Sequence, residues 1–200
     1  MKSIEFAELI GIVLGDGNVY EYVKGKGIAN YSIRIAGDAV KDLEYHTFIF
    51  RLCLQLFNYK SRLYFHSTRR EIISHIYGKK YVELFKTQGI LPGNKIKNKS
   101  TIPLWIFENE DYLKACIRGL IDTDGSIYRM GKWNQMCFKK HNLTLLEDFR
   151  RGLLILGYTP SKITLNKVYI SKRREIQRYH EEIGFNNPKH EHRYLKFVNV

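Results

Sequence analysis

Cysteine, proline and long apolar runs are all scarce in this sequence of 200 residues. It contains three cysteines and four prolines. The three cysteines (Cys53, Cys116 and Cys137) are odd in number and far apart, which excludes a disulfide framework and a CxxC zinc site, so we expect them in the core. No apolar run approaches the ~18 residues of a membrane-spanning helix, and the N-terminus lacks a signal peptide. We therefore expect an intracellular protein, cytoplasmic or organellar, with no membrane partner.

Acidic residues are also few in relation to basic ones. Thirty-three lysines and arginines against 20 aspartates and glutamates give a net charge of +13. An excess of this size favours a polyanionic partner, with nucleic acid as the first candidate and an anionic membrane surface as the second. The hydrophobic content of 44% is ordinary for a folded domain, so disorder is not expected.

An internal repeat organises the chain. The segment FAELIGIVLGDGNVY (6–20) matches LKACIRGLIDTDGSIY (113–128) without a gap from residue 114 onward, at an offset of 108, and this match pairs Asp16 with Asp124. Further along, QGILPGNK (88–95) resembles EIGFNNPK (182–189). Repeats of this kind indicate one structural unit written twice. We expect a first half at residues 1–89, a linker at 90–103 and a second half at 104–200.

Apolar periodicity gives the elements of each half. In the first copy it predicts helices at 4–15, 39–57 and 79–87, and strands at 18–24, 30–36, 61–67 and 71–77. A turn is expected at Gly25-Lys26-Gly27. The prediction is an α+β fold of two αββαββα halves with antiparallel sheets.

The first helix of each half carries small residues four positions apart. Ala7, Gly11 and Gly15 form one such face, and Ala115, Gly119 and Thr123 form the other. Glycine inside a helix costs about 1 kcal/mol relative to alanine, and close approach of the two helices is the simplest reason for accepting that cost in both copies.

Such packing brings Asp16 and Asp124 together at the C-terminal ends of the two helices. Two carboxylates beside two negative helix ends need a cation, and carboxylate and carbonyl oxygens are ligands that Mg²⁺ takes. This arrangement predicts metal-dependent hydrolysis of a phosphodiester. The alternative is that each Asp-Gly pair is only a turn, but the matched positions and the basic charge favour the metal site.

The motifs LIGIVLGDG (9–17) and IRGLIDTDG (117–125) are similar to those of a known family. They resemble the two copies of the LAGLIDADG motif of homing endonucleases, as do the flanking stretches IPLWIF (102–107) and IGFNNPK (183–189). The resemblance implies an intron-encoded monomer whose two sheets form a DNA-binding saddle. It also implies cleavage of both strands of a long double-stranded DNA target, leaving short 3′ overhangs, with Mg²⁺ as cofactor and Mn²⁺ able to substitute.

The resemblance also assigns roles to residues around the aspartates. Gly15 and Thr123 join Asp16 and Asp124 as metal ligands, and Lys139 and Lys140 support the active site at the end of a second-half strand. The aligned first-half positions hold Ala36, Gly37 and Asp38, which predicts unequal cleavage of the two strands. Lys95 or Lys97 could substitute only if the linker folds back toward the site.

Strand alternation separates a core face from a DNA-facing one. Inward positions in the first half are Val19, Val23, Ile33, Ile35, Leu63 and Phe65. Outward residues can read base edges or hold phosphates. In the first half they are Asn18, Tyr20, Tyr22, Lys24, Ser32, Arg34, Arg62, Tyr64 and His66, with Arg69 and Arg70 in a basic loop. In the second half they are Ser126, Tyr128, Gln135, Lys139, Lys162, Thr164 and Asn166.

Other interpretations of the sequence stay open. A protein of the same fold could bind intron RNA as a maturase, or bind DNA without cutting it, although both aspartates argue against a purely binding role. A basic structural protein would bind any duplex without site preference. His190 and His192 lie in a polar segment and are expected to be solvated, because no other metal-ligand pattern accompanies them.

Overall fold

The first half contains the predicted elements in the predicted order. The computed structural model describes residues 1–25, 28–131 and 133–198, so the turn expected at Gly25-Lys26-Gly27 lies partly outside the described residues. The elements are α1 (Ile4–Leu14), β1 (Gly17–Lys24), β2 (Ile28–Asp38), α2 (Leu43–Phe57), β3 (Arg62–Phe65), β4 (Glu71–Tyr77) and α3 (Lys79–Thr87). The strands form an antiparallel sheet in the order β1-β2-β4-β3. The αββαββα pattern is therefore confirmed here.

The second half repeats this plan with a smaller sheet. Its elements are α4 (Leu104–Phe107), α5 (Glu110–Asp124), β5 (Gly125–Met130), β6 (Trp133–Lys139), α6 (Leu143–Ile155), β7 (Lys167–Ile170), α7 (Arg173–Glu182) and α8 (Pro188–Val198). The sheet has three strands in the order β5-β6-β7. The strand matching β3 is reduced to one bridge between Thr164 and Lys167. Leu165 and Asn166 between them have φ values of 49° and 59°, so this segment is a tight turn.

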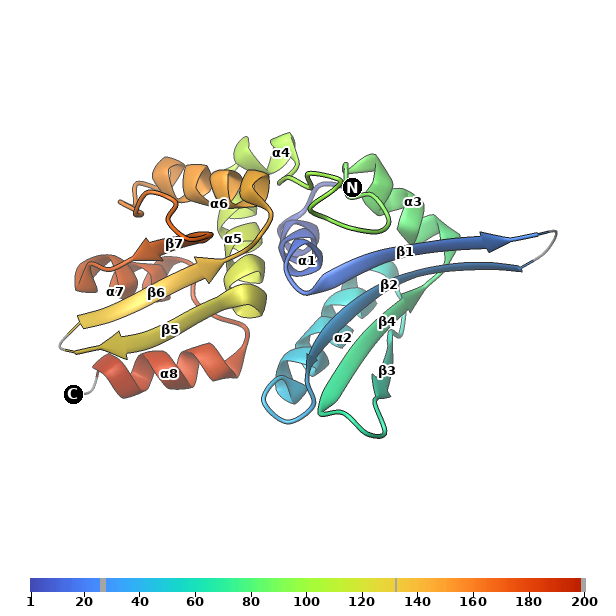
Figure 1. The fold of residues 1–200 in the computed structure, drawn as a ribbon, viewed down its shortest axis with the longest axis horizontal. Helices are drawn as coiled ribbons and strands as arrows, with labels where there is room; N and C mark the ends of the chain where they lie inside the picture. Colours follow the sequence, from blue (N-terminus) through green and yellow to red (C-terminus); the bar gives the residue numbers. More distant parts are fainter. Residues whose placement is uncertain (26–27, 132, 199–200) are drawn as a thin grey trace.

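Helices α1 and α5 lie side by side at the centre of the molecule, with one sheet on either side (Figure 1). A Cβ atom at Gly11 would lie 2.2 Å from the carbonyl oxygen of Cys116, and one at Gly119 would lie 2.5 Å from that of Glu8. No larger residue fits this contact. The glycines expected to bring the helices together do so, and the core is continuous through both helices into both halves.

Each central helix begins at a side-chain cap. The Ser3 hydroxyl accepts the N–H of Phe6 at 3.2 Å, and the Asn109 side chain accepts that of Tyr112 at 3.0 Å. These bonds satisfy N–H groups that have no partner within the helix. From these caps, both helices run to the motif aspartates at their C-terminal ends.

The prediction of inward positions on the first sheet is confirmed only where helices cover the sheet. Val19, Ile33 and Ile35 are buried as expected. Val23, Leu63 and Phe65 were expected inside but are exposed, because they lie toward strand ends or on the edge strand β3. Leu165, which matches Phe65 in the repeat at an offset of 100, is likewise exposed, at 85%, in its turn.

Ser32 shows the opposite error, since it was expected to be outward-facing and accessible but is fully buried. It lies in register between Tyr20 and Tyr77, and its hydroxyl accepts a hydrogen bond from Nε of Arg34 at 3.2 Å. Larger neighbours on the same face therefore cover this small side chain.

The cysteines are buried, and so is one histidine that was expected to be solvated. All three cysteines are buried, and Cys53 and Cys116 lie in the core as predicted, but Cys137 lies on the face of β6 opposite to the core residues Met136 and Phe138. The prediction for His190 was wrong: it is fully buried on α8, a helix that packs along β5. Burial lowers the pKa of its imidazole to about 3. Among the described residues, no helix is long and apolar enough to cross a membrane.

Candidate active site

The two motif aspartates meet where the central helices end. Asp124 is the last residue of α5, and Asp16 follows the end of α1 at Gly15. A Cβ atom at Gly15 would lie 1.9 Å from Oγ1 of Thr123 and 3.3 Å from Oδ2 of Asp124. The absence of a side chain at Gly15 therefore lets the end of α5 approach the first-half backbone directly.

Lys140 joins the two halves at this point. Its ammonium forms an ion pair with the carboxylate of Asp124 and donates to the carbonyl oxygen of Gly15 at 2.9 Å. The lysine follows directly after β6, so its position is set by the sheet. The matching first-half position is Gly37, where a Cβ atom would lie 2.5 Å from Nε2 of His46. The first half therefore has no room for an equivalent side chain there.

A second ammonium group reaches the site from the segment between the halves. Lys95 donates to the carbonyl oxygens of Val13 at 3.2 Å and Leu14 at 2.9 Å, and to that of Gly15. Burial, reinforced by Lys140, lowers the pKa of Lys95 to about 8. Residues 90–103 do fold back toward the site, which is the condition on which a role for Lys95 depended.

The surroundings of Asp16 disfavour its negative charge. Desolvation by burial and the nearby Asp124 raise the pKa of Asp16 to about 6, although Lys140, Lys189 and Lys95 act in the opposite direction. In this environment, a carboxyl group is stabilised in its anionic form when a cation binds beside it. Beside it, Asp124, Lys95, Lys139, Lys140 and four neighbours line a hollow of about 380 Å³.

The remaining predicted site residues differ in how close they lie to the two aspartates. Lys139 lines the hollow but is exposed and makes no described contact with either aspartate. The hydroxyl of Thr123 donates back to the carbonyls of Gly119 and Leu120, at 2.9 and 3.0 Å. Within the described residues no group of three His, Cys, Asp or Glu side chains could hold a metal.

On the first sheet, four polar side chains form one cross-strand row. Asn18 pairs with Arg34, Arg34 with His75, and His75 with Arg62. The guanidinium of Arg34 lies 4.3 Å from the ring centre of Tyr20, and His75 stacks on Tyr77 at 5.2 Å. His75 and Tyr77 were missed in the sequence because the apolar residues of 71–77 hide the alternation.

The matching row of the second sheet is shorter and uncharged. Ser126 pairs with Cys137, and Cys137 with Tyr169. Beside it, the hydroxyl of Tyr128 donates to Gln135 at 3.0 Å. Tyr169 was also missed, because no strand was predicted at Lys167–Ile170.

Several predicted DNA contacts lie away from these rows. Lys162, Thr164 and Asn166 lie outside the strands, in or next to the turn that replaces the fourth strand. Arg70 forms an ion pair with Asp38 at 2.9 Å. The remaining first-half candidates, Tyr22, Lys24, Tyr64, His66 and Arg69, lie toward strand ends or in the β3–β4 loop.

Comparison with known proteins agrees with this geometry. Residues 111–184 match the model of the LAGLIDADG-like domain. A comparison with curated protein sequences finds no match.

Solved structures of homing endonucleases have the same fold. A structure of I-DmoI in complex with DNA and Mn aligns with a TM-score of 0.62 and 19% identity, covering 90% of this chain and 96% of that one. The meganuclease I-SmaMI bound to DNA aligns with a TM-score of 0.59 and 12% identity, covering 96% and 88%. I-AabMI bound to uncleaved DNA gives 0.58 and 10%, covering 92% and 86%. Residues 111–184 therefore form a LAGLIDADG-like domain, and the chain as a whole has the fold of these homing endonucleases, with both motif helices on one polypeptide.

Proposed function

We propose that this chain is a site-specific homing endonuclease that hydrolyses both strands of a long double-stranded DNA target and leaves short 3′ overhangs. The observation that carries the proposal is the meeting of Asp16 and Asp124 at the ends of two paired helices, between two sheets that present basic and polar rows. Structural neighbours were solved with DNA, and one of them with DNA and Mn. The net charge of +13 suits a DNA partner.

The donor set of the site fits a hard divalent cation. The carboxylates of Asp16 and Asp124 and the carbonyl oxygens of Gly15 and Thr123 would hold Mg²⁺, or Mn²⁺ in its place. The raised pKa of Asp16 is the observation that supports this fit, because protein groups alone compensate the charge of this carboxylate poorly. When bound, such a cation lowers the pKa of a water nucleophile and stabilises the departing oxygen of a phosphodiester.

The chain's own basic residues act on the phosphate. Lys140 and Lys95 bring two ammonium groups to the carbonyl of Gly15, where they can stabilise the negative charge that develops on the scissile phosphate. Lys139, at the rim of the hollow, is placed to bind a neighbouring phosphate. The aspartates orient the reacting groups, and the rows on the two sheets position the duplex over them.

Because both halves of the site lie on one chain, the enzyme is proposed to act as a monomer. Its two sheets read two different half-sites, since the row at Arg34 and the row at Cys137 differ in chemistry.

A plasmid cleavage assay tests the proposal. The target is first selected from a DNA library, and supercoiled plasmid carrying it is then incubated with Mg²⁺ and wild type, Asp16→Asn or Asp124→Asn. We expect each substitution to lower the rate of linearisation by about 1000-fold, because the site loses a metal ligand. Binding in Ca²⁺ should persist in both variants. Undiminished cleavage by both would overturn the assignment, and intron RNA splicing without DNA cleavage would indicate a maturase.

A further inference from the structure

Two lysines occupy corresponding places in the second repeated segment of the chain. Lys95 closes the segment QGILPGNK and Lys189 closes the matching EIGFNNPK. Each lies near the end of a motif helix. Lys95 contacts the last carbonyls of α1. Two residues before Lys189, Asn187 donates to the carbonyl of Asp122 near the end of α5 at 2.9 Å. Symmetry would therefore give each half one lysine of this kind.

The two ammonium groups nevertheless have different partners. That of Lys95 bonds to the α1 carbonyls beside Asp16. That of Lys189 bonds instead to Oδ1 of Asp42 at 2.8 Å. Only 19% of the Lys189 side chain and 11% of the Asp42 side chain are exposed. This ion pair is therefore shielded from solvent and is held more firmly than a surface pair.

One difference between the halves accounts for the two arrangements of the lysines: the first half has an acid where the second half has an amide. Asp42 and Asn142 are the residues that precede α2 and α6. The amide of Asn142 donates to the carbonyl of Ser100 at 2.7 Å and to that of Lys95 at 3.4 Å. It therefore binds only the backbone of the linker, and the Lys95 ammonium can bond to the α1 carbonyls.

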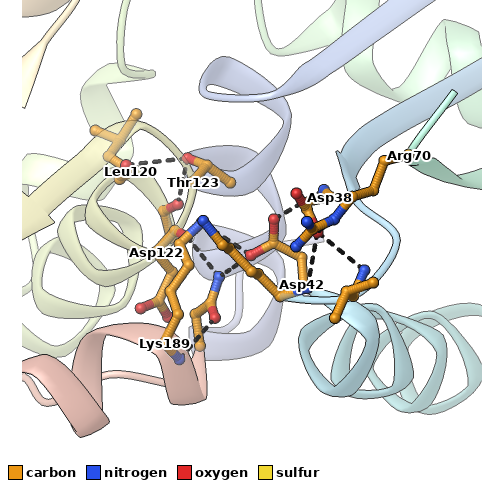
Figure 2. Close-up of polar contacts among 11 residues, drawn as sticks. Asp38, Asp42, Arg70, Leu120, Asp122, Thr123 and Lys189 are labelled. Atoms are coloured by element: carbon orange, nitrogen blue, oxygen red, sulfur yellow. Dashed lines mark hydrogen bonds and ion pairs between the residues drawn. The ribbon is translucent and has the colours of Figure 1, made fainter.

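An ionised aspartate can only accept hydrogen bonds. Asp42 accepts the backbone N–H of Asp38 at 2.9 Å through one oxygen, and the Asn187 amide at 2.9 Å together with the Lys189 ammonium through the other. Figure 2 shows Asp42 between Asp38 of the first half and Lys189 of the second. These hydrogen bonds lower the pKa of Asp42 in spite of its desolvation, so it stays an anion and a partner for Lys189.

The consequence for the site is that only one of the two corresponding lysines adds its charge there. Lys95 bonds to the carbonyl of Gly15 at the end of α1, whereas Lys140 bridges the two halves through that carbonyl and Asp124. Among the described hydrogen bonds, none brings an ammonium to the last carbonyls of α5; Asn187 reaches Asp122 there instead. Lys189 comes only two residues after Asn187, which bonds to that end of α5, so the lysine lies beside the site while its ammonium is bonded to Asp42.

We propose that Asp42 holds the ammonium of Lys189 outside the active site, and that the two DNA strands are therefore cleaved at unequal rates. Asp42 acts here as a positioning residue, because it keeps the ammonium of Lys189 away from the active site. The inference rests on the proposed nuclease function.

Matched lysine variants provide the first test. Lys95→Gln and Lys189→Gln both keep a hydrogen-bond donor and remove the charge. With the two strands of a target duplex labelled separately, Lys95→Gln should slow one strand by about 100-fold, as expected for loss of a group that stabilises developing charge. Lys189→Gln should change either rate by less than about twofold, since the withheld ammonium contributes nothing. If Lys189→Gln slows a strand as much as Lys95→Gln does, the proposal is wrong.

Release of the lysine provides the second test. Asp42→Asn should raise the rate on the slower strand by about tenfold, and the double variant Asp42→Asn with Lys189→Gln should lose that gain. A merely structural role for Asp42 predicts loss of activity on both strands, in both backgrounds. DNA binding in Ca²⁺ and thermal unfolding verify that each variant is folded; if Asp42→Asn does not fold, the lysine pair alone decides.

A third measurement needs neither metal nor cleavage. Acylation of lysine amines in the metal-free protein, mapped by mass spectrometry, should modify Lys189 several times faster in Asp42→Asn than in wild type, while Lys140 is unchanged. Equal rates at Lys189 would overturn the sequestration. If wild type cuts no DNA at all, the nuclease proposal fails, and this measurement still decides where Lys189 is held.

Discussion

The two sheets of this molecule differ more than the two helices that join them. The first sheet has four strands, and its central row carries Asn18, Arg34, His75 and Arg62. The second has three strands, and its central row carries Ser126, Cys137 and Tyr169. Helices α1 and α5, in contrast, meet through glycines in matching positions.

This difference shows which parts of a duplicated fold are free to diverge. At the helix contact, backbone lies against backbone, so any added atom is costly in either copy. On a sheet face, a side chain meets only its cross-strand neighbours and the ligand, so each copy can carry its own chemistry. We expect the first half to supply more of the base recognition and both halves to supply the hydrolytic centre.

Alanine at the helix contact should have the largest effect and should act equally in both halves. Gly11→Ala and Gly119→Ala each place a Cβ atom within 2.5 Å of a carbonyl oxygen of the other helix. We expect each to lower the free energy of unfolding by about 3 kcal/mol, measured by chemical denaturation. Gly152→Ala is the control, because its Cβ would meet only side-chain atoms, at 3.1 Å and beyond. A tolerated alanine at either contact glycine would break the symmetry of the helix pair.

Replacing Arg34 should weaken DNA recognition through the first half alone. Tyr20 and Ser32 hold its guanidinium in place, and a held guanidinium can bond two acceptors of a guanine. Arg34→Ala should weaken binding in Ca²⁺ by about 2 kcal/mol and relax the preference at one base pair of the first half-site. Cys137→Ala, at the matching position, should leave base preference unchanged. A uniform loss over all sequences would reassign Arg34 to phosphate binding.

Much of the fold and of the candidate site could be predicted from the sequence, for identifiable reasons. The repeat located α1 and α5. The glycine faces of those helices then required Asp16 and Asp124 to meet, because each aspartate lies one residue beyond its helix's row of small residues. The alternating residues of β1 and β2 located Arg34 and its neighbours.

What the sequence did not predict depends on contacts between distant segments. Lys189 and Asp42 are far apart in sequence, so no local pattern joins them. Lys95 could be considered only on the condition that the linker folded back. The fourth strand of the second sheet was expected by symmetry, but Leu165 and Asn166 take positive φ values there, and a tight turn leaves too few residues for a strand. The proposed boundaries at 89, 103 and 104 stay a prediction.

Removing the charge of Asp16 should stabilise the metal-free protein, with a moderate and pH-dependent effect. The pKa of Asp16 is raised from 3.8 to about 6, so its folded state favours the protonated form. The resulting stability is present below pH 3.8 and is lost as the pH rises through about 6. Asp16→Asn should therefore raise Tm by about 2 to 6 °C at pH 8, by about half as much at pH 5, and very little below about pH 3.8.

The second half should respond differently to the same change. Asp124 is paired with Lys140, so Asp124→Asn removes an ion pair and should not raise Tm at pH 8. Differential scanning calorimetry in EDTA measures both variants, and added Mg²⁺ should stabilise wild type only. Equal stabilisation by the two substitutions would mean that the aspartates have the same electrostatic environment.

The smallest expected effect is at Lys162, where the second half has no strand to match β3. Lys162 is exposed and lies beside Arg150 and Arg151 next to α6, outside the sheet, so it can meet only the DNA backbone. Lys162→Ala should weaken binding by about twofold on every sequence and reduce the salt dependence by the equivalent of one phosphate contact or less. Arg62→Ala, on β3 in the row with His75, should have a larger and sequence-dependent effect. A change in base preference for Lys162→Ala would mean that the turn at Leu165 and Asn166 enters a groove of the DNA. The second half would then use a loop to build the recognition surface that the first half builds with its fourth strand.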